Sequence, residues 1–123
     1  MAKQDVQLDL MIMSGPDDGL VHKLTGDFVH DEHLDQWGCR FTIGRRDKCN
    51  VCIPFDTLVS RLHASLEVTP DNQIWLIDEK SRNGTFIERE KVTVPHELTP
   101  SNLFKIGKTL IRIQILHIAK GVE

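Results

Sequence analysis

The sequence predicts an all-β domain built as a β-sandwich. Apolar residues recur with a period close to two along most of the chain, and clusters of turn-forming residues separate these runs at short intervals. No segment has the apolar spacing of an amphipathic helix longer than two turns. Short strands of this kind, with turns between them and no intervening helices, indicate a sandwich rather than alternating βαβ units.

The individual strands follow from the same alternation. Residues 6–12 alternate apolar and polar side chains, and the glycine, proline and aspartates of residues 15–19 then turn the chain. Two further hairpins are expected, with turns at residues 70–72 and at Gly107-Lys108. In chain order, the predicted strands cover residues 6–12, 20–24, 40–43, 51–55, 64–69, 74–78, 104–106 and 111–115.

Length and composition predict one globular domain over residues 1–123. A chain of 123 residues suits a single core, and 40% hydrophobic with 27% charged residues is ordinary for a globular protein.

The net charge of −3 argues against nucleic acid as the main ligand, and the N-terminus lacks the apolar run of a signal peptide. Three irregularly spaced cysteines fit a reducing cytosol, so we expect a cytoplasmic protein. The acidic segment 26–38 is expected to be a long solvated hairpin loop.

Three polar clusters lie between the predicted strands and point to anion binding. A phosphate dianion carries a charge of about −1.5 to −2 and three acceptor oxygens, so its site must offer fixed cations and several donors. Arginine suits this task because its planar guanidinium makes charge-assisted, often bidentate hydrogen bonds. Glycine beside such groups permits close backbone approach or positive φ. The clusters are Gly44-Arg45-Arg46, Ser60-Arg61-Leu62-His63 and Ser81-Arg82-Asn83-Gly84-Thr85.

In this order and spacing, the clusters resemble the G-R, S-x-x-H and N-G motifs of the forkhead-associated (FHA) family. The motif-bearing region, residues 40–118, covers well over half of the chain. The resemblance implies a sandwich of two twisted, mostly antiparallel sheets with about eleven strands, whose loops at one end bind phosphothreonine peptides. It implies a partner linked to a Ser/Thr kinase and predicts no nucleic-acid partner, no membrane insertion and no cofactor.

The resemblance also implies a role for each matching residue. Arg45 would contact the phosphate and hold the neighbouring loop, and Ser60 would donate its hydroxyl to a phosphate oxygen. Asn83 would grip the peptide backbone beside the phosphothreonine. Arg61 and Arg82 would face the phosphate or the peptide.

Four more positions would support the site without binding the ligand. Gly44 permits a close approach before Arg45, His63 braces the binding loop from beneath, and Gly84 and Thr85 shape the last turn. The chain departs from the family pattern where many relatives repeat an Asn-Gly, since it has residues 88–90 as Glu-Arg-Glu. The acidic segment also looks longer than the family norm.

Other functions are weighed against this one. A phosphate-independent scaffold, using a sandwich face or the acidic segment, is the alternative. Cys49 and Cys52 form a C-x-x-C that could be a redox pair or half of a zinc site, but the second half is missing. His30 and His33 resemble metal ligands by composition alone. No catalytic or metal site is expected, because His63 has no partner at a spacing that completes a triad.

Overall fold

The computed structural model describes residues 4–120 and contains twelve strands in two sheets within that range. Their bounds are β1 (Gln4–Ile12), β2 (Val21–Asp27), β3 (Val29–Asp31), β4 (Gln36–Gly44), β5 (Val51–Cys52), β6 (Ala64–Val68), β7 (Ile74–Asp78), β8 (Thr85–Ile87), β9 (Glu90–Lys91), β10 (His96–Leu98), β11 (Leu103–Ile106) and β12 (Thr109–Lys120). Within the described residues, no helix is long and apolar enough to span a membrane.

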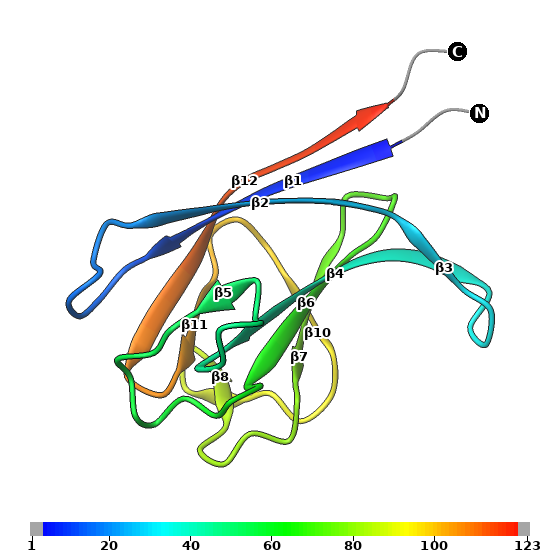
Figure 1. The fold of residues 1–123 in the computed structure, drawn as a ribbon. Helices are drawn as coiled ribbons and strands as arrows, with labels where there is room; N and C mark the ends of the chain where they lie inside the picture. The colour runs from blue at the N-terminus through cyan, green and yellow to red at the C-terminus, as the bar shows by residue number, and fades with distance from the viewer. Residues whose placement is uncertain (1–3, 121–123) are drawn as a thin grey trace.

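The first sheet has the strand order β2-β1-β12-β11-β8-β9. Strand β1 lies between β2 and β12 and pairs with both in antiparallel fashion, so the first and last strands of the fold are neighbours (Figure 1). The register of β1 and β12 shifts between Asp9 and Leu10. Such a β-bulge increases the local twist, which helps this sheet wrap over the other.

The second sheet has the order β10-β7-β6-β4-β3, and the short strand β5 pairs with β4. The β4–β5 pair is parallel and all other pairs are antiparallel. The parallel pair sets Gly44 beside Cys52, so the loop between β4 and β5 begins and ends next to the last residues of β4. The two sheets, with nearly all strand pairs antiparallel, confirm the predicted fold class, an all-β sandwich.

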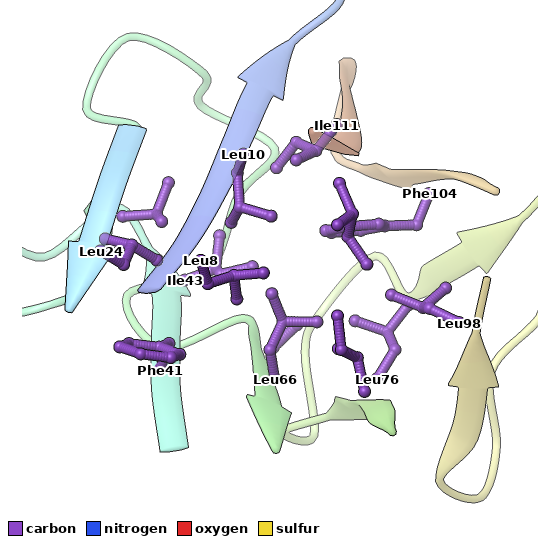
Figure 2. Close-up of a cluster of buried hydrophobic side chains, with 14 of the residues drawn as sticks. Leu8, Leu10, Leu24, Phe41, Ile43, Leu66, Leu76, Leu98, Phe104 and Ile111 are labelled. Atoms are coloured by element: carbon purple, nitrogen blue, oxygen red, sulfur yellow. The ribbon is translucent and has the colours of Figure 1, made fainter. Parts of the chain in front are cut away.

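The core lies between the two sheets (Figure 2). Leu8 and Leu10 of β1 are fully buried and face the second sheet, from which Phe41 and Leu66 point inward (Figure 2). Fully burying each large aliphatic side chain contributes roughly 1.5–3 kcal/mol, so this layer supplies much of the stability that fixes the loops.

The alternation found most strands, but three parts of the fold differ from the prediction. The expected strand over residues 51–55 ends at Cys52, because Pro54 cannot donate to a ladder. Strands β8, β9 and β10 were not predicted, since each has only two or three residues and shows no alternation long enough to recognise.

The acidic segment 26–38 differs from the expected solvated hairpin loop, because most of it forms strands. It is largely paired: β3 is antiparallel to the start of β4, and the turn between them takes only residues 32–35. Valine and tryptophan favour strands, and pairing satisfies the backbone donors that a long loop would leave to water. The resulting hairpin projects from the sandwich at the right of Figure 1.

The loops that follow β5 and β7 gather at the opposite, lower end of the molecule (Figure 1). These loops, together with the one after β4, carry the three polar clusters. The fold therefore brings residues from three separate parts of the chain to one end of a rigid sandwich.

Candidate functional site

The site begins where β4 ends, at the buried Gly44. A Cβ atom on this residue would lie 2.1 Å from the carbonyl oxygen of Arg61 and 3.0 Å from the Cys49 sulfur, so a side chain cannot fit. Close approach, rather than positive φ, explains the glycine. It lets two backbone hydrogen bonds form: Arg45 N–H donates to Ser60 O at 3.0 Å, and Arg46 N–H to Arg61 O at 3.2 Å.

Arg45 is held by the loop beside it. Its Nε–H donates to the carbonyl oxygen of Val59 at 2.9 Å, which fixes the guanidinium plane against the β5–β6 loop. A guanidinium has five N–H donors, and the other four have no protein partner within residues 4–120. The side chain is therefore oriented and still has both terminal nitrogens for an anion.

Ser60 connects the second cluster to the third. Its Oγ accepts a hydrogen bond from the backbone N–H of Arg82 at 3.0 Å. Because this bond uses the hydroxyl as an acceptor, its own proton remains available to donate to a ligand oxygen. The neighbouring Asn83 donates from Nδ2 to the carbonyl oxygen of Leu58 at 2.9 Å and keeps one N–H and its oxygen unused.

His63 lies beneath these loops and is completely buried. Its Nδ1 accepts from the backbone N–H of Ser60 at 3.0 Å, so Nε2 carries the proton and donates to the Gly84 carbonyl at 2.8 Å. Its backbone N–H donates to Ile43 O at 2.9 Å, and its carbonyl accepts from Glu79 N–H at 3.0 Å. One residue thus joins β4, the β5–β6 loop and the β7–β8 loop.

The turn between β7 and β8 is built around Asp78. The carboxylate accepts from the Ser81 hydroxyl, from Ser81 N–H at 3.2 Å and from the Thr85 hydroxyl at 2.7 Å. Burial alone would raise the pKa of Asp78, but these hydrogen bonds outweigh it and lower that pKa. Gly84 has φ of 87°, which glycine adopts freely, and its N–H donates to Ser81 Oγ at 2.9 Å.

Asp56 is a buried carboxylate that sequence reasoning missed. Its Oδ2 accepts from Lys108 N–H at 2.8 Å and from the Thr109 hydroxyl at 2.7 Å, and its Oδ1 accepts from Leu58 N–H at 3.0 Å. It therefore ties the β5–β6 loop to the β11–β12 turn. Burial would raise the pKa of Asp56, yet the hydrogen bonds from Thr109, Lys108 and Leu58 lower it. An aspartate often forms a turn by accepting from the backbone N–H two residues later, as Asp56 does from Leu58. This pattern does not reveal a partner 52 residues away.

An open cavity of about 320 Å³ lies beside these loops. Arg45 and Arg61, two of the predicted site residues, line it together with Arg46 and Lys48, which the sequence motifs did not single out for the site. Asp47 is the one acidic residue of the lining. Ser60, Arg82 and Asn83 are not part of its lining. Hydrogen bonds link Ser60 to Arg45 and to Arg82, and Asn83 to Leu58, so these residues belong to the loops beside the cavity.

The cysteine pair borders the same loops. Cys49 Sγ donates to Arg61 O at 3.3 Å, and Cys52 Sγ donates to Arg45 O at 3.6 Å. Burial, with the nearby Asp47 carboxylate and the Cys49 sulfur, raises the pKa of Cys52, which favours the thiol over a metal-binding thiolate. Across residues 4–120, no three His, Cys, Asp or Glu side chains come together as metal ligands would.

The sequence matches one known protein family. The FHA domain model matches residues 41–107, just over half of the chain, and the matched region contains all three polar clusters. The chain therefore belongs to the FHA domain family, whose members are protein-interaction modules. A search of curated protein sequences found no matching relative.

Solved FHA domains share the fold. The FHA domain of CT664 from Chlamydia trachomatis is 20% identical, covers 87% of this chain and 95% of its own, and has a TM-score of 0.70. The N-terminal FHA domain of S. cerevisiae Rad53p, solved with a phosphothreonine peptide, is 18% identical over 91% of each chain, with a TM-score of 0.64. Mycobacterium tuberculosis EmbR, in complex with a low-affinity phosphopeptide, is 19% identical, with a TM-score of 0.68 over 89% of this chain and 24% of its own.

Replacing His63 with alanine should destabilise the fold. The substitution leaves the Ser60 N–H and the Gly84 carbonyl without partners, at a cost of roughly 1–3 kcal/mol for a buried polar group. Thermal unfolding should show a lower Tm for His63→Ala, while His96→Ala, which changes an exposed histidine, should not. An unchanged Tm for His63→Ala would contradict the bracing role.

Asp56 should make stability fall in acid. Because the folded-state pKa lies below the ordinary value of 3.8, ionised Asp56 stabilises the fold above that pH, and the contribution is lost as pH falls through the folded-state pKa. Asp56→Asn should therefore lower the free energy of unfolding at pH 7, with a difference from wild type that shrinks below about pH 4. Denaturant titrations at several pH values test this, with the exposed Asp71→Asn as control. A difference independent of pH would refute it.

Proposed function

We propose that this FHA domain binds segments of partner proteins that contain phosphothreonine, in assemblies controlled by a Ser/Thr kinase. One observation carries the proposal: the Arg45 guanidinium is oriented by the carbonyl of Val59, and the next residue, Ser60, has a hydroxyl proton that is unused. Fixed cations and donors of this kind are what a phosphate dianion requires. The Rad53p domain and EmbR, each solved with a phosphopeptide, support the same reading.

Each residue has a proposed part in binding. Arg45 and Ser60 hold the phosphate, with the positive charge of Arg61 and Arg82 close to it. Asn83 uses its free N–H and oxygen to bond the peptide backbone beside the phosphothreonine. Gly44, His63, Gly84 and Thr85 keep these groups in place and do not touch the ligand.

A purely binding role fits the hydrogen bonds around His63. A catalytic histidine would need a nitrogen facing the nucleophile, but Nδ1 bonds the backbone N–H of Ser60 rather than its hydroxyl, and Nε2 bonds Gly84. We therefore propose an interaction module without catalytic activity.

We also propose that residues 1–123 form a single domain that acts in the cytoplasm. Both sheets of the described residues close over one core, which supports a single folding unit. The three cysteines are free thiols, as expected in a reducing compartment.

One observation favours a second candidate, a phosphate-independent scaffold. The β3–β4 hairpin exposes three large apolar side chains, with Val29 at 70%, Leu34 at 65% and Trp37 at 55% exposure. Large exposed apolar groups on one element can mark contact surfaces; here Val29 and Trp37 point to opposite faces of the hairpin, because Trp37 pairs with His30. Capture of the natural partner before and after phosphatase treatment separates the two candidates, because only the scaffold would keep its partner after the phosphates are removed.

Arg45→Ala and Ser60→Ala should each severely weaken binding to a phosphothreonine peptide. Losing a charged partner of a desolvated phosphate costs about 2–5 kcal/mol, and losing a hydrogen bond to a charged group costs about 1.5–3 kcal/mol. Calorimetric titration measures the affinity, and circular dichroism checks that each variant is folded. Lys23→Ala, which removes an exposed cation from β2, is the control. Wild-type affinity in folded Arg45→Ala would remove the site assignment.

Phosphothreonine should bind better than phosphoserine in the same peptide, and the unphosphorylated threonine peptide should not bind measurably. The two phosphopeptides carry the same charge, so any preference comes from the extra methyl group. Its burial contributes about 0.8 kcal/mol, and the restricted rotamers of the β-branched threonine add to this. Competition titrations with the three peptides test the order. Equal affinities for the two phosphopeptides would leave a general phosphopeptide binder.

A further inference from the structure

The lining of the open hollow beside the phosphate residues extends beyond the residues proposed to hold the phosphate. Of its five lining residues, Arg46, Asp47 and Lys48 come from the loop after β4 and have no part in the proposed phosphothreonine contacts.

Charge gives the same result independently. The lining carries four cations and one carboxylate, a net charge of +3, although the whole chain has a formal net charge of −3. A phosphate dianion supplies about −1.5 to −2, which leaves cationic charge without a counterion. Arg82, bonded through its backbone to Ser60 at 3.0 Å, adds another cation nearby.

The backbone that presents Arg46 and Lys48 is fixed. Arg46 N–H donates to Arg61 O at 3.2 Å, and Cys49 N–H donates to Arg46 O at 3.0 Å, which closes a turn around residues 47 and 48. Both side chains are exposed, so they can reach a ligand without breaking a bond within the described part of the chain. Arg46 and Lys48 line the same hollow as Arg45 and Arg61, so they extend the site along the loop after β4.

We propose that Arg46 and Lys48 bind a second anionic side chain of the same phosphothreonine peptide. This inference rests on the proposed function and specifies its ligand: a segment with one phosphothreonine and, within a few residues, either a carboxylate or a second phosphate. Both anions neutralise the surplus charge, and arginine pairs with either in bidentate geometry. The loop after β4 thereby selects among phosphothreonine segments that Arg45 and Ser60 would bind alike.

The test uses one parent phosphothreonine peptide with neutral flanking residues. In one series, a single Glu is moved from four residues before the phosphothreonine to four residues after it; in a second series, phosphoserine takes the place of Glu. Affinities are measured by fluorescence anisotropy for wild type, for Arg46→Gln/Lys48→Gln and for the matched control Lys23→Gln/Lys105→Gln, which removes two exposed cations from β2 and β11. Salt titrations of the best peptide accompany them.

We expect at least one position where the second anion raises wild-type affinity by about tenfold, a change equivalent to about 1.4 kcal/mol. The gain should disappear in Arg46→Gln/Lys48→Gln, persist in the control and decrease with salt. A gain from phosphoserine alone identifies a second phosphate as the ligand, and a gain from Glu identifies an acidic segment.

Two results would overturn the inference while leaving the proposed function intact. One is a parent peptide that binds wild type and gains nothing from a second anion at any position. The other is a gain that survives in Arg46→Gln/Lys48→Gln. If no phosphothreonine peptide binds, with or without a second anion, the proposed function itself fails.

Discussion

The two side-chain hydrogen bonds of His63 set the spacing of the whole binding end. The imidazole has a fixed size, so the Ser60 N–H and the Gly84 carbonyl are held at opposite ends of one rigid ring. The site needs Arg45, Ser60 and Asn83 to stay within reach of one ligand, yet they come from three loops with no regular structure of their own. The buried imidazole links two of those loops and holds them in position at a low cost in conformational entropy. Because the ring lies in the core, it does not obstruct the ligand.

Two carboxylates complete the framework from the sides. Asp78 organises the turn that carries Arg82 and Asn83, while Asp56 anchors the loop that carries Ser60 to the far sheet. Both carboxylates are turned toward backbone N–H and hydroxyl donors, so neither competes with a phosphate for the arginines. Apart from Asp47, which lines the hollow with the cations, the negative charges near the site lie underneath and the positive charges lie at the surface.

Much of the fold could be predicted from the sequence, because the alternation of β1, β6 and β7 is long enough to identify a buried face. The ligand-binding motifs could be found because Gly44, Ser60 and Asn83 belong to short patterns with a physical reason for each residue type. Asp56 could not be found in this way, since its role depends on a partner 52 residues later. The short strands β8 to β10 were also missed, because pairing with neighbours rather than local pattern makes them strands.

The acidic segment shows a different limit. Its composition indicated solvent exposure, which the hairpin retains, but the charges concealed the β-pairing of Val29 and Trp37. Composition reports what a segment faces, whereas backbone pairing depends on what lies next to it in space.

The placement of that hairpin also sets a group of carboxylates apart from the arginines of the site loops. Asp31, Glu32 and Asp35 extend at one side of the sandwich, while the arginines lie on the loops at its other end (Figure 1). The field of such an arrangement acts over about 10 Å at 0.1 M salt, before any contact forms. An anionic partner of the proposed site would then be repelled from the hairpin and turned toward the loops during diffusional encounter, so a larger share of collisions would begin in the productive orientation.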